Sequence, residues 1–341
     1  MIITAGGNAA GKSQFQNKFT EDTILLAGKD YIIIIVDEFT FHWINATWVL
    51  ANMSSTFLEI CGNNRYYLYC NIVIPGLQHK FNEVMTMTIK EKVTAALPMT
   101  GTHVNLTDPI VTEIFASVGY DFIWVDMEHT ALSCEQVYHH LLAARACGTP
   151  VFVRVPVDDL TVTKRILEMG VDGIIFPMVK DAEHAKHLLD NTLYPPYGTR
   201  GCGPKGAVRY GLESESEYYG PGHLKLCRFV QIEQASAAEE AEKIAAIPYL
   251  DGCVLGMHDL SGSIGRLGDI FCEENLQLAE KAIAAFKAAG KTVGVSTFAT
   301  DPETLSRYHR MGINMISTGA DYDYVAKKSI ETLNTMKNIR G

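Results

Sequence analysis

The sequence lacks several features that membrane, secreted and nucleic-acid-binding proteins need. It has no run of about 18 apolar residues, as a membrane-spanning helix requires, and residues 1–10 lack the basic stretch and leucine-rich core of a signal peptide. The 341 residues include 29 Lys and Arg against 39 Asp and Glu, a net charge of -10. Nucleic acids and anionic membranes are bound by clustered positive charge, so we expect neither as a partner and predict a small-molecule substrate.

The eight cysteines form no C-x-x-C pair, and several lie inside apolar runs. This pattern disfavours a zinc ribbon and a disulfide framework. We expect free thiols in a protein of the reducing cytoplasm. With 47% hydrophobic residues, the chain is long enough for one large α/β domain or for two smaller ones.

Residues 1–86 differ in pattern from the rest of the chain. The stretch GGNAAGKS matches the phosphate-loop motif through Gly6, Gly11, Lys12 and Ser13. Residues 31–38, YIIIIVDE, are typical of the apolar strand that ends in a Mg²⁺-binding acid in such proteins. Residues 39–81 show no clear period, however, and a P-loop domain needs more βα units. We therefore expect 1–86 to be a vestigial, fused or spurious leader, with nucleotide binding as the alternative.

From Met87 to the end, apolar runs alternate eight times with helical patterns, after a lead-in helix at 88–96. The predicted strands are 101–104, 122–126, 151–155, 173–177, 228–232, 253–256, 292–296 and 314–318. The predicted helices are 109–118, 133–147, 160–169, 182–190, 236–246, 274–289, 302–311 and 322–338. An open doubly wound sheet would also alternate, but eight units over 87–341 predict a (β/α)₈ TIM barrel. Gly148, Gly170, Gly290 and Gly312 each follow a helix, where a left-handed residue is favoured.

Two carboxylates, Glu233 and Asp259, follow successive predicted strands joined by an alanine-rich helix. Parallel strands present their carboxyl ends at one face of a barrel, so the two side chains would lie side by side. With water and a bidentate substrate they would suit Mg²⁺ or Mn²⁺. The alternative is that Glu233 caps the following helix and Asp259 closes a turn.

Other polar residues at the predicted strand ends suggest chemistry on an enolate. Arg154 follows the third strand, and its permanent charge would stabilise an enolate oxygen or a carboxylate. His129, in the run Asp126-Met127-Glu128-His129, titrates near neutrality and can move protons. Gln231 would hydrogen-bond a carbonyl oxygen. The backbone amides of the run Gly256-Met257-His258 would bind a substrate carboxylate.

The runs DFIWVDMEHT, VFVRVP, FPMVKDAEHA, YPPYGTRGCGP, VQIE and DGCVLGMHDLSGSIG resemble the HpcH/HpaI family of metal-dependent 2-keto acid aldolases. The resemblance covers about 87–339 and implies a barrel that binds a divalent metal through Glu233 and Asp259. It also implies that Arg154 stabilises the enolate and that His129, with Asp126 nearby, assists proton transfer. It further implies a hexamer in which the last helix packs on a neighbour and Glu168 reaches His129 of another subunit, although the family carries Asp there.

Three positions depart from the family pattern. Met257 and His258 replace a proline and a small residue before the metal-binding acid, and His103 replaces an aromatic residue at the end of the first strand. These positions leave the substrate's identity open. The segment 197–219 is either a mobile loop over the site or an ordinary connection of unusual length.

These observations lead to one main hypothesis and two alternatives. We expect an aldolase that uses Mg²⁺, Mn²⁺ or Co²⁺ to cleave a 4-hydroxy-2-oxo acid reversibly into pyruvate and an aldehyde. A CoA-ester lyase of the citrate-lyase type would share the enolate chemistry, but no basic groove for an adenine nucleotide is evident. The alternative of another class is a P-loop nucleotide-binding protein that uses residues 6–13.

Overall fold

The computed structural model describes residues 23–27, 32–36 and 87–340. The chain divides into two compact units, 1–86 and 87–341. In the first unit, β1 (Thr23–Ala27) and β2 (Ile32–Val36) form an antiparallel pair, and β2 falls within the strand predicted at 31–38. The predicted phosphate loop at 6–13 lies outside the described residues, so nucleotide binding there stays a prediction.

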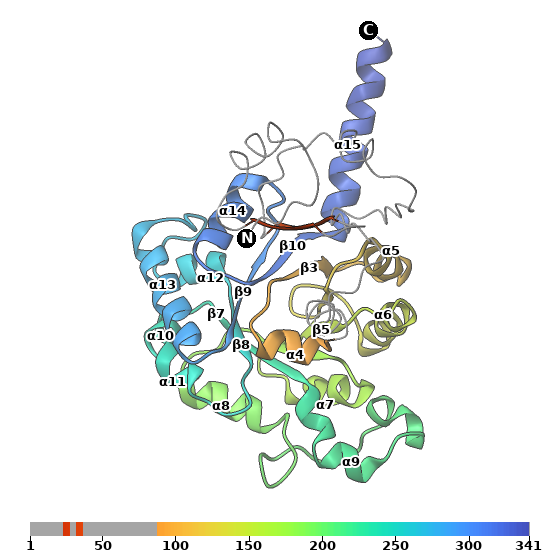
Figure 1. The fold of residues 1–341 in the computed structure, drawn as a ribbon, viewed down its shortest axis with the longest axis vertical. Helices are drawn as coiled ribbons and strands as arrows, with labels where there is room; N and C mark the ends of the chain where they lie inside the picture. Colours follow the sequence, from red (N-terminus) through yellow and green to blue (C-terminus); the bar gives the residue numbers. More distant parts are fainter. Residues whose placement is uncertain (1–22, 28–31, 37–86, 341) are drawn as a thin grey trace. The chain divides into compact units, whose positions relative to one another are not determined.

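The second unit is a closed barrel of eight parallel strands with helices around it (Figure 1). The order around the barrel is β10-β3-β4-β5-β6-β7-β8-β9, so strands that are consecutive in the chain pair with each other and the last closes onto the first. The strands are β3 (Met99–Val104), β4 (Phe122–Asp126), β5 (Val151–Arg154), β6 (Gly173–Phe176), β7 (Cys227–Ile232), β8 (Gly252–Leu255), β9 (Thr292–Thr297) and β10 (Met315–Ala320). The predicted (β/α)₈ barrel is confirmed.

The helices that surround the strands lie close to their predicted positions, except for two short ones at 215–219 and 257–263 that were not predicted. They are α4 (Ile89–Thr94), α5 (Ile110–Val118), α6 (Cys134–Ala146), α7 (Leu160–Met169), α8 (Ala182–Asp190), α9 (Glu215–Tyr219), α10 (Ala235–Glu239), α11 (Ala241–Ala245), α12 (Met257–Ser263), α13 (Glu273–Ala288), α14 (Pro302–Arg310) and α15 (Asp321–Arg340), with the short 3₁₀ helices η1 (Gly206–Gly211) and η2 (Gly222–Lys225). No helix among these described segments is long and apolar enough to cross a membrane.

Local sequence explains where several helices begin and end. Thr88 caps α4 and Ser133 caps α6, each through a reciprocal capping box with the residue three positions later. The glycines predicted to follow helices all have positive φ, from 68° at Gly290 to 84° at Gly312. A residue with a Cβ is strained in that conformation, so these glycines stop the helices at defined points.

Two apolar layers hold the barrel together. The outer layer packs the helices on the strands, and the inner layer fills the barrel with large side chains such as Phe122, Phe152 and Phe229. The rings of Phe122 and Phe152 stack at a centroid distance of 4.8 Å. Gly101 and Gly173 make room for these rings because they have no Cβ. A Cβ at either position would lie 2.4 Å from a ring carbon.

Helix α4 closes the amino end of the barrel. Its Val93 is fully buried in the inner apolar layer, and its carbonyl oxygen accepts a hydrogen bond from Thr292 Oγ1 at 2.7 Å. Lys90 Nζ donates to both carboxylate oxygens of Asp251 at 2.6 and 2.7 Å, and Asn314 Nδ2 donates to the Ala96 carbonyl oxygen. The segment 88–96 is thus part of the barrel unit.

One predicted detail of the helices is wrong. The alanine-rich helix predicted at 236–246 is interrupted at Glu240, which joins α10 and α11 with φ -96° and ψ 14°. Its carboxylate accepts a hydrogen bond from the Ala182 backbone N–H at 3.0 Å, so a contact with α8 accompanies the break. The residues after β8, for which we predicted no helix, form α12.

The segment between α8 and β7 does not cover the mouth of its own barrel. It connects the end of a helix to the start of a strand, which places it at the amino end. It packs there against α7, where Lys205 N donates to the Glu168 carbonyl oxygen at 3.4 Å. The prediction that 197–219 forms a loop over the site of its own chain is therefore wrong.

The last helix, α15, extends away from the barrel body (Figure 1). Several of its apolar side chains are exposed, namely Val325, Ile330, Leu333, Met336 and Ile339. Exposed apolar residues along one helix are typical of surfaces that contact another protein.

The position of α4 leads to a prediction about the leader. A chain that begins at Met87 should fold as the barrel, because α4 and its contacts remain intact. A chain that begins at Leu97 should lose about 3 kcal/mol or more of unfolding free energy, through the buried Val93 and the hydrogen bonds of α4. Urea unfolding followed by circular dichroism measures both. Failure of the Met87 chain to fold, or equal stability of the two, would contradict this boundary.

Candidate active site

The predicted polar residues meet at the carboxyl end of the barrel. Asp126 ends β4, Arg154 ends β5, Glu233 follows β7, and Asp259 lies in the first turn of α12 after β8. Asp126, Arg154 and Glu233 are each at most 5% exposed. The adjacent parallel strands therefore bring together the carboxylates and the arginine that we predicted from the sequence.

The centre of this group is the guanidinium of Arg154. It donates to both oxygens of Asp126, from Nε at 2.9 Å and from Nη2 at 2.6 Å. On its other edge, Nη1 lies 3.0 Å from Glu128 Oε2 and 3.3 Å from Gln231 Oε1. A planar guanidinium bound bidentately on one edge has a fixed orientation. Its Nη1 edge consequently faces Glu128 and Gln231.

Glu233 is held by a second set of hydrogen bonds. Gln231 Nε2 donates to Glu233 Oε2 at 3.0 Å, and the Met178 backbone N–H, in the loop after β6, donates to Oε1 at 2.5 Å. Gly256 allows this packing, because a Cβ there would lie 2.4 Å from Glu233 Oε2. The alternative that Glu233 caps the following helix is not observed, since Gln234 is the N-cap residue of α10.

The site has more acidic groups than basic ones. Burial raises the pKa of Glu233 to about 7, and the negative charges of Glu128 and Asp259 act in the same direction. Burial also raises the pKa of Glu128, against the lowering effect of Arg154. Burial raises the pKa of Asp126 too, but the hydrogen bonds and charge of Arg154 outweigh it, so that pKa stays low. One arginine is thus shared among several carboxylates.

These residues fit a divalent cation. Glu128, Glu233 and Asp259 lie close enough for their charges to affect one another. A cation between them would offset the burial and the repulsion that together raise the pKa of Glu233. Within 87–340 and the two described strands, no group of three or more His, Cys, Asp or Glu has the arrangement of a complete metal site. Mg²⁺ is usually bound by one or two protein carboxylates together with water and substrate oxygens, and seldom by protein ligands alone. Two carboxylates at an open site therefore suit Mg²⁺.

Other predicted residues lie around the rim. The His129 side chain is 60% exposed, with Nε2 3.5 Å from Glu128 Oε2. His258 is exposed beside Asp259, while Met257 is buried at the start of α12. The expected amide group of 256–258 is therefore the first turn of a helix, which still directs backbone N–H groups toward the mouth.

Glu168 lies away from this group within the chain. It is near the end of α7, at the amino end of the barrel, where its carboxylate faces Gly203. Its Oε1 is buried and has no hydrogen-bond partner among the described residues. The predicted contact with His129 would join two subunits, so it stays a prediction.

His103 occupies the wall of the barrel next to the site. Nδ1 lies 2.7 Å from the Gly319 carbonyl oxygen and Nε2 lies 2.9 Å from Ser296 Oγ. A carbonyl oxygen only accepts, so Nδ1 carries the proton and Nε2 accepts from the Ser296 hydroxyl. Burial lowers the pKa of His103 to about 4. This imidazole is therefore neutral near pH 7.

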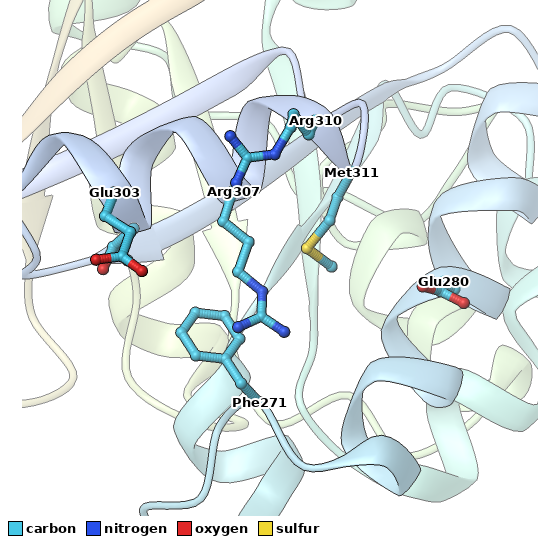
Figure 2. Close-up of a pocket in the computed structure, with 7 residues that line it drawn as sticks. Phe271, Glu280, Glu303, Arg307, Arg310 and Met311 are labelled. Carbon is cyan, nitrogen blue, oxygen red and sulfur yellow. The ribbon is translucent and has the colours of Figure 1, made fainter.

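Two of the hollows on the described surface of the barrel unit bear on the location of the site. A cleft of about 460 Å³ adjoins Asp126 and His129 at the mouth. A larger groove of about 660 Å³ lies on the outside, between α13 and α14 (Figure 2). There Arg307 stacks on Phe271, 3.9 Å from the ring centroid. The outer groove includes none of the strand-end residues, so we assign the chemistry to the mouth.

Sequence reasoning missed several residues that shape the site. Glu128 was noted in its motif but not assigned a role, and only its contact with Arg154 reveals one. Met178 contributes a backbone N–H, which no side-chain pattern signals, although its positive φ of 53° marks an unusual turn. Ser296 and Asp321 act through partners about 200 residues away in the chain.

Comparisons with known proteins agree on one family. The sequence model described as HpcH/HpaI aldolase/citrate lyase matches residues 99–327. A hydroxypyruvate/pyruvate aldolase of Roseovarius nubinhibens is 29% identical over 73% of this chain and 96% of its own length. A 2-keto-3-deoxy-L-rhamnonate aldolase of Escherichia coli is 29% identical over 70% of this chain and 89% of its own. The crystal structure of an HpcH/HpaI aldolase/citrate lyase family protein from Burkholderia cenocepacia J2315 superposes with a TM-score of 0.68, at 29% identity, over 73% of this chain and 98% of that one.

The neutral His103 predicts a specific loss of stability in acid. Its pKa is about 4 when folded and about 6.5 when unfolded, so the unfolded state binds more protons between these values. The stabilisation is complete above pH 6.5 and falls by up to about 3 kcal/mol as the pH drops to 4. Urea unfolding of the wild type and of His103→Gln across this range measures it. The wild type should lose more stability than the variant, and parallel curves would contradict the assignment.

Proposed function

The chain belongs to the HpcH/HpaI aldolase/citrate lyase family, and on this basis we propose that it is a metal-dependent aldolase that cleaves a 4-hydroxy-2-oxo acid into pyruvate and an aldehyde. The strongest support is the fixed guanidinium of Arg154, whose Nη1 edge faces Glu128 and Gln231 beside Glu233. A rigid cation beside a carboxylate pair is what an enolate intermediate requires.

Glu233 and Asp259 would hold the cation, which we propose to be Mg²⁺, Mn²⁺ or Co²⁺. When bound, it would polarise the 2-oxo group of the substrate as a Lewis acid. The raised pKa of Glu233 supports this assignment, because a buried carboxylate close to other acids is stabilised by a nearby cation. Gln231 and the Met178 N–H would keep the Glu233 carboxylate oriented, as is usual for metal ligands.

The protein groups then have distinct tasks in cleavage. The first-turn amides of α12, at Met257 and His258, bind the substrate carboxylate. His129 takes the proton of the 4-hydroxyl group, the C3–C4 bond breaks, and its electron pair forms the pyruvate enolate while the aldehyde leaves. Arg154 stabilises the negative charge on the enolate oxygen. Protonation of the enolate carbon gives pyruvate, and the reverse sequence forms the carbon–carbon bond.

We also propose that the enzyme is a homo-oligomer. The support is the row of exposed apolar residues on α15, which projects from the barrel. A second chain that covers this row would remove it from water. The predicted approach of Glu168 to His129 of another subunit would require such an assembly.

Metal dependence gives the first test. EDTA should abolish pyruvate release from a panel of 4-hydroxy-2-oxo acids, and Mg²⁺, Mn²⁺ or Co²⁺ should restore it. Calorimetric titration with Mn²⁺ should detect one site, which Glu233→Gln weakens by at least about 10-fold through loss of one charged ligand. Lys180→Gln, at a lysine on the rim outside the proposed ligand set, serves as the control. Trapping of substrate on a lysine by borohydride would contradict the mechanism.

The roles of Arg154 and His129 can be distinguished by comparing two reactions. Arg154→Ala should lower both aldol cleavage and exchange of the pyruvate methyl protons with solvent, by about 10² to 10³ in turnover, because both form an enolate. His129→Ala should lower cleavage by about 10² to 10⁴ and exchange by less, because exchange needs no hydroxyl deprotonation. Arg165→Ala, an exposed position on α7, is the control. Equal losses in both reactions for both variants would contradict the separate roles.

A further inference from the structure

A group of buried polar side chains at the amino end of the barrel lacks hydrogen-bond partners. Tyr194, Arg200 and His223, in the segment between α8 and β7, are 2%, 3% and 1% exposed. Among the described residues, no partner lies within reach of Tyr194 Oη, of Arg200 Nε and Nη2, or of His223 Nε2. Buried polar atoms in native proteins are almost always paired, so these unpaired atoms indicate a ligand that completes them.

The three side chains pack against one another. The guanidinium carbon of Arg200 lies 4.6 Å from the centre of the Tyr194 ring, and that ring centre lies 5.1 Å from the centre of the His223 ring. Tyr218 of α9 joins the group, with its ring centre 5.7 Å from the guanidinium carbon and 6.1 Å from the ring centre of Tyr194. The unpaired atoms therefore belong to one cluster, termed the Arg200 cluster (Tyr194, Arg200, Tyr218 and His223).

The free edge of Arg200 is the edge that suits an oxyanion. Arg200 Nη1 donates to Tyr218 Oη at 3.3 Å, which leaves the adjacent donors Nε and Nη2 unpaired. Arg154 uses the same pair of atoms to hold both oxygens of Asp126. Two parallel N–H groups match two oxygens of one anion. This edge therefore favours an oxyanion over a spherical ion such as chloride.

A second buried arginine adds positive charge beside the cluster. The Arg228 side chain is fully buried and donates only to neutral oxygens of the segment 192–226. Burial lowers the pKa of Arg228 to about 10; the charge of Asp251 opposes this shift, and the charge of Arg200 adds to it. Asp251 is itself bound by Lys90 at 2.6 Å. Buried charge is costly unless it is paired, so a bound anion would offset the excess of positive charge here.

His223 favours a ligand that can donate a hydrogen bond. Its Nδ1 lies 3.3 Å from the Tyr218 carbonyl oxygen, which only accepts, so Nδ1 carries the proton of the neutral ring and Nε2 is an acceptor. Burial and the charges of Arg228 and Arg200 lower the pKa of His223, which keeps the ring neutral near pH 7. An oxyanion with an O–H group can donate to Nε2. Hydrogen phosphate and bicarbonate have such a group near neutral pH, whereas sulfate and nitrate do not.

The short helix α9 separates the cluster from the surrounding water. No residue of α9 is fully buried, and its Tyr218 and Tyr219 rings contact the Tyr194 ring. The helix lies at the periphery of the barrel unit, away from the strands (Figure 1). A short peripheral helix with few buried contacts opens at low cost, so a small ligand can enter without unfolding of the barrel.

We propose that the Arg200 cluster binds one small oxyanion that retains a proton, namely hydrogen phosphate or bicarbonate. The Nε and Nη2 groups of Arg200 hold two of its oxygens, the Tyr194 hydroxyl donates to the same anion, and His223 Nε2 accepts a hydrogen bond from its O–H group. The bound anion joins the stretch 194–200 to the stretch 218–223. The site lies at the amino end of the barrel, opposite the proposed active site, and does not depend on the aldolase function.

Calorimetric titration of the metal-free protein near neutral pH tests this site. EDTA keeps phosphate and bicarbonate from binding through a divalent metal, and sodium chloride holds the ionic strength constant. Phosphate or bicarbonate should bind at one site per chain. Sulfate and nitrate should bind at least about 10-fold more weakly, because they leave the buried His223 Nε2 without a donor. Titration with phosphate in buffer free of carbon dioxide, and with bicarbonate separately, identifies which of the two anions is bound.

Variants of the cluster locate the bound anion. Arg200→Met should weaken binding by at least about 10-fold, because it removes two charge-assisted hydrogen bonds. Arg209→Met makes the same change at an exposed arginine of the same segment and should leave the affinity unchanged. Tyr194→Phe removes a single hydroxyl and should weaken binding by about 10-fold, so it tests the site even where Arg200→Met does not fold. His223→Gln should reduce the preference over sulfate, because an amide can also donate.

Three results would overturn the proposal. The first is the absence of binding by both phosphate and bicarbonate, and the second is equal affinity for sulfate. The third is binding that neither Arg200→Met nor Tyr194→Phe weakens, which would place the anion elsewhere on the protein. None of these results bears on the proposed aldolase, whose assays follow pyruvate release at the other end of the barrel.

Discussion

The active-site end of the barrel depends on a single buried guanidinium. Arg154 joins the end of β4 through Asp126 and that of β7 through Gln231, and Gln231 in turn orients Glu233. Breaking such a buried pair leaves an uncompensated charge, at a cost of about 3–5 kcal/mol. The arginine therefore fixes the relative positions of the strand ends, and the proposed enolate chemistry depends on the charge that it presents.

Much of the fold was predictable because the strands of a parallel barrel are buried on both faces. Their continuous apolar runs, such as 122–125 and 174–176, stand out in the sequence. The site was partly predictable for a related reason, because the carboxyl ends of all eight strands meet at one mouth. Reading the residue that follows each run therefore identified Asp126, Arg154, Glu233 and Asp259 as neighbours.

The remaining details depend on contacts that no local pattern contains. The break at Glu240 accompanies a hydrogen bond with the start of α8, 58 positions away, and nothing in the run of alanines signals it. Segment 197–219 connects a helix to the next strand, so it lies at the amino end of the barrel. Its sequence motif alone does not show at which end of the barrel it lies. The tautomer of His103 is set by Gly319, which is distant in the chain. Such pairings become visible only once the barrel has closed.

The contact between Asp321 and the loop after β3 also orders events during synthesis. Asp321 is made 216 residues after Asn105, an interval of about 10 to 40 s at ordinary rates of translation. During that time β3 has no partner on the side where β10 will pair, and the loop at 105–106 has no carboxylate to hold it. The first strand of the barrel is thus an open edge on the ribosome, the kind of surface on which chaperones act, until the last strand arrives.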